Sequence, residues 1–184
     1  MKFVRQHIPE VVLIKPEMHG DDRGYFIETF RQDLFEKAIG YRVNFVQDNQ
    51  SKSKKGVLRG LHYQLSPFSQ AKLVRVLEGR VLDVAVDMRK SSPSFGQHVA
   101  AELTAQNKHQ LFVPHGFAHG FVVLSESATF AYKVDNYYAP AHDRGISFDD
   151  PRLGIDWVLS LVDLKLSDKD KNHPFIANAK DLFE

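Results

Sequence analysis

Four short stretches of the chain combine ionisable side chains with glycines and apolar residues. They are residues 22–28, 47–49, 58–64 and 114–120. Taken singly, each has an ordinary explanation: Arg23 and Glu28 could form a surface ion pair, residues 47–49 could be a turn, and His62 could be a packed histidine. If several strands aim such groups into the mouth of one barrel, the same residues form a ligand site suited to acid–base chemistry.

Two ionisable residues lie in the middle of predicted strands. Residues 82, 84 and 86 are apolar and share one face, which leaves Asp83 on the other face. By the same alternation, His119 shares a face with the phenylalanines at 117 and 121. A lone acid in this position usually faces solvent, and a lone histidine on an apolar face is usually a satisfied core residue. The alternative is that both point into a pocket, and the alternation alone leaves the choice open.

Short runs of β-branched, aromatic and aliphatic residues dominate the chain and predict the strands that carry these groups. They span residues 25–30, 43–46, 57–64, 73–77, 81–86, 99–103, 110–114, 117–124 and 129–134. Turn signals such as residues 78–80 and 91–94 separate them. We therefore expect a mostly-β fold, as a closed barrel or sandwich rather than an alternation of strands and helices.

Helices are expected to be few and short. Residues 33–39 followed by Gly40 have the pattern of a helix with a glycine stop, and Ser167 could cap a second helix over residues 168–171. Beyond residue 140 the apolar pattern thins, so we expect the last forty or so residues to form loops and short helices over one end of the barrel.

Length and composition limit the function classes. A chain of 184 residues with 43% apolar residues predicts a single domain over residues 1–184. With no cysteine, disulfides and thiolate chemistry are excluded, although nine histidines could still bind a metal. The apolar run at residues 11–14 is too short for a signal peptide or a membrane span, so a cytoplasmic protein with no membrane partner is expected. The near-balance of 24 basic and 23 acidic residues argues against a nucleic-acid partner.

Five strings of the sequence carry a family resemblance. They are GDDRG at 20–24, FVQDN at 45–49, VLRGLH at 57–62, FVPHGFAHGF at 112–121 and LSDKD at 166–170. In this order they resemble the dTDP-4-dehydrorhamnose 3,5-epimerase family, with small departures at Gln50, where the family usually has His, and Ala71, where Gly is common. The resemblance implies a cupin-like jelly-roll barrel with a few short peripheral helices. It also implies cofactor-independent inversion of carbons 3 and 5 of a dTDP-4-keto-6-deoxyhexose, and a homodimer.

The resemblance assigns the proton transfers to particular residues. It implies that His62 is the base, that Asp170 is its partner, and that Tyr132 is the acid on the opposite face of the sugar. These types suit the roles, since an imidazole titrates near neutral pH and a phenol is normally protonated there. Lys72 is our candidate for stabilising the enolate oxygen. His119 and Asp83 would form a second polar pair near the ketone.

The nucleotide part of the substrate needs other groups. The residues expected to bind substrate are Arg23, Glu28, Gln47, Asp48, Asn49, Arg59, Lys72, His119, Tyr138, Asp143 and Lys169. By resemblance, arginine and lysine bind the diphosphate and Tyr138 stacks on the base. One difficulty is that Arg59 and His62 are three residues apart, so a regular strand would point them to opposite faces. A bulge at Gly60 would solve it, as would an Arg59 that reaches around an edge or to a partner subunit.

A metal site is not expected. The string Pro114-x-Gly116-x-x-His119 matches the second half of a cupin metal signature, but His62 stands alone where the first half needs a His-x-His pair. Metal-dependent cupin chemistry is therefore the least favoured function. An epimerase of one carbon, or a ketoisomerase, is the nearest rival, and Tyr132 argues against it. A sugar-nucleotide binding module without activity would not need His62 and Lys72.

Overall fold

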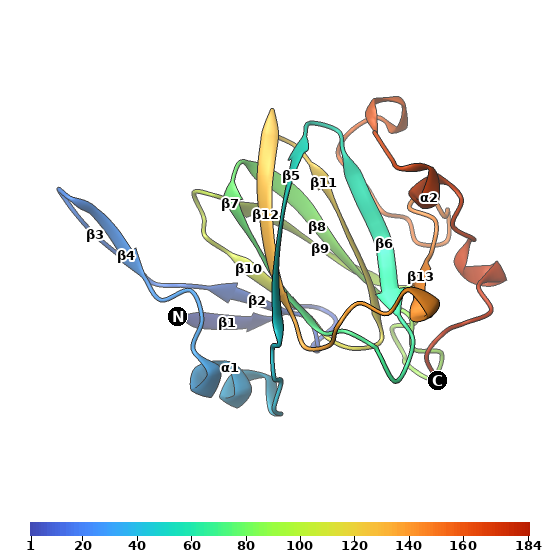
Figure 1. Cartoon of the computed structure of the whole chain (residues 1–184), viewed down its shortest axis with the longest axis horizontal. Coiled ribbons are helices and arrows are strands. Elements are labelled where there is room, and N and C mark those ends of the chain that lie inside the picture. The colour runs from blue at the N-terminus through green and yellow to red at the C-terminus, as the bar shows by residue number, and fades with distance from the viewer.

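Two antiparallel sheets face each other in the computed structural model, which describes residues 1–184 (Figure 1). One sheet has the order β1 (Lys2–Arg5), β2 (Val12–Lys15), β10 (Gln110–Val113), β7 (Lys72–Glu78), β12 (Ser127–Val134) and β5 (Gln47–Lys54). The other has the order β13 (Asp143–Gly145), β6 (Leu58–Gln64), β11 (Phe117–Val123), β8 (Arg80–Asp87) and β9 (His98–Thr104). The mostly-β prediction is confirmed, in its sandwich form, because the two sheets do not join into a closed cylinder.

The inner faces of the two sheets form the main core. Its buried residues include Val74 and Phe130 from the first sheet and Ala85, Phe117 and Phe121 from the second. Apolar residues at every second position bring this about, since alternate side chains of a strand share a face. The mid-strand acid and histidine lie on this inner face, so both are buried and the solvent-facing alternative for Asp83 is wrong.

The C-terminal segment covers the outer face of the five-stranded sheet. Leu153, Trp157 and Ile176 pack there against Val84 and Val86 of β8. We expected this segment to cover one end of the barrel, and that expectation is wrong, because β8 is apolar on its outer face and needs a cover along its length. The segment contains three short elements besides its loops: η2 (Leu161–Asp163), α2 (Asp168–Lys171) and η3 (Ile176–Asn178). Another, η1 (Pro140–His142), lies just before β13.

Both predicted helices are present. Helix α1 (Gln32–Ile39) ends at Gly40, whose φ of 93° is the left-handed conformation that favours glycine at a helix end. Phe35 of α1 packs edge-on against Phe112, with ring centroids 5.0 Å apart. Helix α2 begins at Ser167, whose hydroxyl oxygen accepts a hydrogen bond of 3.1 Å from the backbone N–H of Asp170.

The strand predictions miss five strands: β5, β1, β2, β3 (Met18–Asp21) and β13. Residues 43–46 form no strand; the strand is the polar segment that follows, β5, whose pattern lacks the apolar alternation used for prediction. Strands β1 and β2 were not predicted, because their apolar runs are very short.

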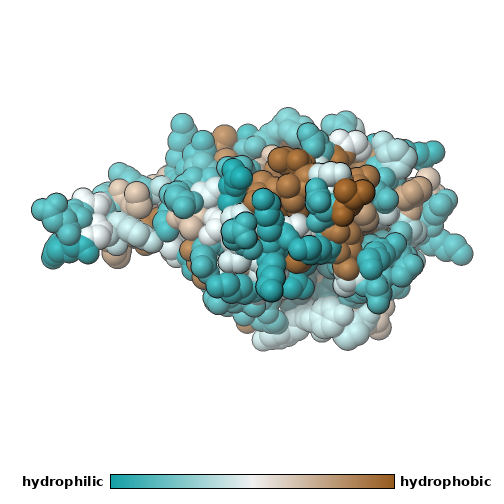
Figure 2. Space-filling model, turned by 90° about the horizontal axis from the view of Figure 1, so that it is seen from above, coloured by the Kyte–Doolittle hydropathy of each residue, from teal (hydrophilic) through white to brown (hydrophobic).

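A two-stranded hairpin of β3 (Met18–Asp21) and β4 (Gly24–Ile27) projects from the body (Figure 1). Seen from above, the same arm extends to one side, while apolar residues gather on the body (Figure 2). Strand β4 is shorter than the strand predicted over residues 25–30.

None of the helices has the length and apolar character needed to span a membrane.

Candidate active site

A cavity of about 290 Å³ opens between the two sheets. It is lined by Ser51, Arg59, His62, Lys72, His119, Phe121, Phe130, Tyr132, Ser167, Lys169 and Asp170. Seven of these are ionisable residues predicted from the sequence to belong to one site: Arg59, His62, Lys72, His119, Tyr132, Lys169 and Asp170. His62 belongs to one sheet and Tyr132 to the other, so their side chains flank whatever occupies the space between them.

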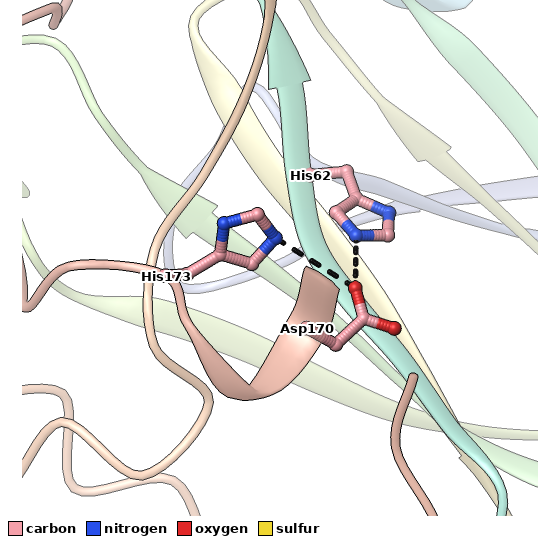
Figure 3. A group of neighbouring side chains, drawn as sticks. All are labelled: His62, Asp170 and His173. Atoms are coloured by element: carbon pink, nitrogen blue, oxygen red, sulfur yellow. Dashed lines mark hydrogen bonds and ion pairs between the residues drawn. The ribbon is translucent and has the colours of Figure 1, made fainter. Parts of the chain in front are cut away.

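His62 is held by a buried carboxylate. Its Nε2 lies 2.5 Å from Oδ1 of Asp170 (Figure 3). The other carboxylate oxygen accepts a hydrogen bond of 2.8 Å from the hydroxyl of Ser167. Burial lowers the pKa of His62, and Asp170 opposes this. Burial also acts to raise the pKa of Asp170, but His173, His62 and Ser167 together hold it below its usual value. The carboxylate therefore stays ionised. With Nε2 facing the carboxylate, Nδ1 is the nitrogen free to accept a proton.

Lys72 and Tyr132 lie on neighbouring strands of the six-stranded sheet. Burial lowers the pKa of Lys72 to about 8, while the carboxylates of Asp143 and Asp83 act in the opposite direction. Burial raises the pKa of Tyr132, which keeps its phenol protonated at neutral pH. The cavity therefore holds a cation that gives up its proton unusually easily and a hydroxyl group able to donate one.

His119 and Asp83 form a second histidine–carboxylate pair at the same cavity. Nε2 of His119 lies 3.0 Å from each oxygen of Asp83, whose side chain is fully buried. Asp83 lies behind His119 rather than on the cavity wall. The pairing explains how an acid can occupy the middle of a core strand, since a buried carboxylate needs hydrogen-bond donors.

A bulge at Gly60 brings Arg59 and His62 to the same side of β6. Opposite them on β11, His119 pairs with His62 and Phe121 pairs with Arg59, so β6 has one residue more than its partner over this interval. Gly60 has a φ of 138°, and a Cβ there would lie 2.5 Å from the Cα of Gly120. Of the three explanations for the spacing, the structure selects the bulge, and only glycine fits it.

A chain of hydrogen bonds leads from the cavity to the surface. The ammonium of Lys169 pairs with Asp143, and the same carboxylate oxygen accepts a hydrogen bond of 2.9 Å from the hydroxyl of Tyr138. Burial acts to raise the pKa of Asp143, but Lys169 and Tyr138 together lower it. Arg59 donates from Nε to the hydroxyl of Ser53 over 3.2 Å. Besides Lys72, the cations Arg59 and Lys169 thus lie at the cavity, where an anionic group can reach them.

A family model described as dTDP-4-dehydrorhamnose 3,5-epimerase matches residues 5–178. The chain belongs to this family. The family's enzyme from Shigella flexneri is 54% identical over 172 residues, which cover 94% of each chain, and that from Pseudomonas aeruginosa is 54% identical over 179 residues, which cover 97% of this chain and 98% of the other. A crystal structure of the 3,5-epimerase from Legionella pneumophila with dTDP-4-keto-L-rhamnose has a TM-score of 0.93 at 47% identity, covering 97% of this chain and 94% of that one. The chain is thus an isomerase with a cupin-like fold.

Seven of the eleven residues expected to bind substrate do not line the epimerase cavity: Arg23, Glu28, Gln47, Asp48, Asn49, Tyr138 and Asp143. Asp48 points to the outer face of β5, where it accepts a hydrogen bond of 2.9 Å from Lys133, because it alternates with its inward-facing neighbours. Arg23 lies on the projecting hairpin, paired with Asp21 and with a side chain that is 90% exposed. Glu28 follows the same hairpin and is exposed. Gln47 and Asn49 do share the inner face of β5, where Gln47 donates to Asn49 over 2.8 Å.

The sequence analysis did not assign four of the residues that line the epimerase cavity: Ser51, Phe121, Phe130 and Ser167. Ser51 lies two residues beyond Asn49 on β5, so alternation would have identified it once residues 47–54 were recognised as a strand. Phe121 and Phe130 lie two residues from His119 and Tyr132 and share their faces. The two phenylalanine rings stack with centroids 4.1 Å apart. Ser167 was predicted only as a helix cap, but its hydroxyl also orients Asp170.

Proposed function

We propose that the chain converts dTDP-4-dehydro-6-deoxyglucose to dTDP-4-dehydrorhamnose by inverting carbons 5 and 3, with His62 as base and Tyr132 as acid. The observation that carries the proposal is that these two groups belong to facing sheets and line one cavity. Inversion requires removal of a proton from one face of the sugar and delivery to the other. A base and an acid on opposite walls meet that requirement.

The proton moves in two steps at each carbon. Nδ1 of His62 accepts the proton beside the ketone, the C–H electron pair forms the enolate, and negative charge develops on the ketone oxygen. Asp170 keeps the proton of His62 on Nε2 and stabilises the imidazolium that forms. Tyr132 then donates its proton to the opposite face of the carbon, the C=O bond re-forms, and solvent restores both protonation states.

Lys72 and His119 stabilise the enolate oxygen in this proposal. The Lys72 ammonium lies in a buried environment, where it stabilises a developing negative charge more strongly than it would in water. His119 is fixed by Asp83 and so presents its ring in one orientation. Because the acid–base set supplies the chemistry by itself, the proposed reaction uses no metal and no organic cofactor.

The nucleotide is proposed to bind at the cationic side of the cavity. Arg59 and Lys169 fit the diphosphate oxygens, the first as a forked donor and the second as a point charge. Tyr138 is 61% exposed beside this group and offers a face on which a pyrimidine base can stack. Gln47 and Asn49 supply amide groups that can hydrogen-bond to the substrate.

We propose that two copies of the chain, each a single domain over residues 1–184, form a homodimer through the β3–β4 hairpin. The hairpin exposes Met18, Tyr25 and Phe26 by 53%, 56% and 67%, and exposed apolar side chains on a projecting arm are typical of an interface. Docking of the arm on a second copy would bring Arg23 toward that copy's cavity. A cytoplasmic location is proposed because a chain without cysteine needs no oxidising compartment; cell fractionation tests it.

The experiment that tests the reaction separates base from acid in deuterated water. His62→Ala is expected to give neither product nor deuterium incorporation, with a loss of at least about a hundredfold, because no proton leaves either carbon. Tyr132→Phe is expected to incorporate deuterium while inversion slows sharply, since His62 can return a solvent-derived proton to the face it came from. Mass and proton spectra of the recovered sugar nucleotide measure both.

Tyr137→Phe is the matched control, because Tyr137 is exposed and does not line the cavity. It is expected to invert both carbons at the parent rate. Deuterium incorporation by His62→Ala would place the base elsewhere, with His119 the next candidate. Inversion at the parent rate by Tyr132→Phe would show that another group is the donor.

A further inference from the structure

Three side chains of types that can bind a metal lie close together, and one of them is the proposed base. Nε2 of His62, a carboxylate oxygen of Asp170 and Nε2 of His173 all lie within 4.8 Å of one another (Figure 3). The two imidazoles approach the carboxylate from different elements, His62 from β6 and His173 from the segment that follows α2. The Asp170 side chain is 6% exposed and that of His173 is 10% exposed.

His173 contributes a nitrogen that has no hydrogen-bond partner. Its Nε2 is buried, and the closest charged atom is Oδ1 of Asp170 at 3.7 Å, beyond hydrogen-bond distance. The ring stands nearly perpendicular to that of His62, with centroids 5.5 Å apart, and packs on the backbone of Gly145. Nε2 of His173 is thus a buried nitrogen without a partner, and it faces a carboxylate that His62 already contacts. Such a nitrogen is available to bind an ion.

We propose that His62, Asp170 and His173 bind one divalent transition-metal ion per chain, with Zn²⁺ the preferred ion, and that this ion inhibits the epimerase. Two imidazoles and a carboxylate are a common ligand set for zinc and leave a fourth position open. Tetrahedral bonds of the usual length place ligand atoms about 3.3 Å apart. The present separations of 2.5 Å and 3.7 Å from Asp170 lie on either side of that value, so small side-chain rotations complete the site.

Inhibition follows from the tautomer of His62. Without metal, Asp170 holds the single ring hydrogen on Nε2, which leaves the lone pair on Nδ1. An ion bound at Nε2 takes that position, so the hydrogen of the neutral ring moves to Nδ1 and Nδ1 can no longer accept a proton. This part of the inference rests on the proposed role of His62, whereas metal binding does not.

The other histidine–carboxylate pairs of the chain provide an internal comparison. His115 lies 2.6 Å from Asp135, and His119 lies 3.0 Å from Asp83. Neither pair has a third ligating group near enough to share an ion with it. The site therefore depends on His173.

Direct binding tests the site without reference to catalysis. Protein freed of metal by a chelator, which is then removed, is titrated with Zn²⁺ by calorimetry and with Co²⁺ by visible absorption. One ion per chain is expected, and His173→Ala should weaken binding at least about a hundredfold. His173→Asn is the second variant if alanine destabilises the chain, and His115→Ala is the matched control that should bind as the parent does. Equal metal affinity in the parent and both His173 variants would overturn the site.

Kinetics test the inhibition. Chelation is expected to leave turnover at or above its starting value, and added Zn²⁺ should lower kcat in proportion to occupancy while dTDP still binds. Relative to its own metal-free rate, His173→Ala should resist the same Zn²⁺ concentration. Metal binding without loss of kcat would overturn the inhibition and the role of His62, but not the site. A chelated enzyme restored only by added metal would contradict both the inhibition and the metal-free mechanism.

Discussion

The buried ammonium of Lys72 leads us to expect that the activity falls at alkaline pH. Burial lowers the pKa of Lys72 to about 8, so the free enzyme loses this cation as the pH rises through 8. If the cation stabilises the enolate, kcat/KM should fall above pH 8, by about tenfold per pH unit. Tyr132 does not account for such a fall, because burial raises its pKa above the ordinary value of a phenol. The measurement is kcat/KM between pH 6 and about 10.

Substitutions at the same position identify the group. Lys72→Arg should move the alkaline limb to higher pH, since a guanidinium keeps its proton there. Lys72→Met should lose at least about a hundredfold in kcat/KM at neutral pH. Lys133→Met is the control, because Lys133 lies on the outer face of the same sheet beside Asp48. An unchanged limb in Lys72→Arg would assign the titration to another group.

Residue types and the family resemblance predicted seven of the eleven residues that line the cavity. The residues that were missed depend on the three-dimensional arrangement of the chain. His62 and Asp170 lie in strings that resemble the family, and the same resemblance assigned Tyr132. Lys72 was predicted because an ammonium suits the enolate oxygen. His173 was not predicted, because its use depends on the turn after α2 and on contact with β6, which is distant in sequence. Nothing in the spacing of residues 170 and 173 separates a ligand pair from two neighbouring surface residues.

At the scale of elements, the bulge in β6 brings two side chains, Arg59 and His62, to the same cavity. Gly60→Ala should destabilise the protein by at least about 3 kcal/mol, because alanine is strained at a φ of 138° and its Cβ meets Gly120. The folded fraction should also lose substrate affinity, since Arg59 and His62 no longer share a face. Urea denaturation and calorimetry with dTDP measure these effects.

Gly40→Ala is the matched control for backbone conformation. Gly40 has a φ of 93°, but a Cβ there meets no atom within 4 Å. Its substitution should therefore cost only about 1–2 kcal/mol. Equal losses at the two positions would show that the contact with Gly120 relaxes and that the bulge does not need glycine.

Element prediction succeeded where alternation was strong. The apolar pattern of β8 and β11 identified the strands, although it could not show that both faces are buried, because the C-terminal cover is a tertiary feature. It failed at β5, whose inner face carries amides and hydroxyls, among them the cavity residue Ser51, instead of apolar side chains. The polar side chains of β5 therefore lack the apolar signal on which the prediction depended.

At the scale of the whole molecule, the proposed arm exchange predicts complementation between Arg23→Ala, expected to be impaired in substrate binding, and His62→Ala, expected to be impaired in proton transfer. In a dimer, the cavity of an Arg23→Ala chain receives the hairpin of its partner. Mixing Arg23→Ala with His62→Ala after dissociation should then restore about a quarter of the parent activity, because half of the dimers are mixed and each has one intact cavity. Activity assays with sedimentation of the same samples measure this.

Absence of complementation would contradict the proposed arm exchange. If Arg23 acts within its own chain or not at all, the mixture gives only the average activity of the two variants. Phe26→Asp is the companion variant, because a charge in place of an exposed ring of the hairpin should weaken the dimer, and Phe26 does not line the cavity of its own chain. A Phe26→Asp protein that sediments as the parent does would place the interface elsewhere.

The position of β5 in its sheet has a consequence for solubility. It pairs only with β12, so its other edge presents unpaired backbone groups that could recruit another strand. Lys52 and Lys54 point outward on this edge strand, and strands of this polarity seldom form aggregates. Lys52→Val with Lys54→Val should therefore aggregate on mild heating, measured by light scattering, while the same pair changed to Arg should stay clear. We therefore expect Lys52 and Lys54 to help keep the protein dispersed at high concentration.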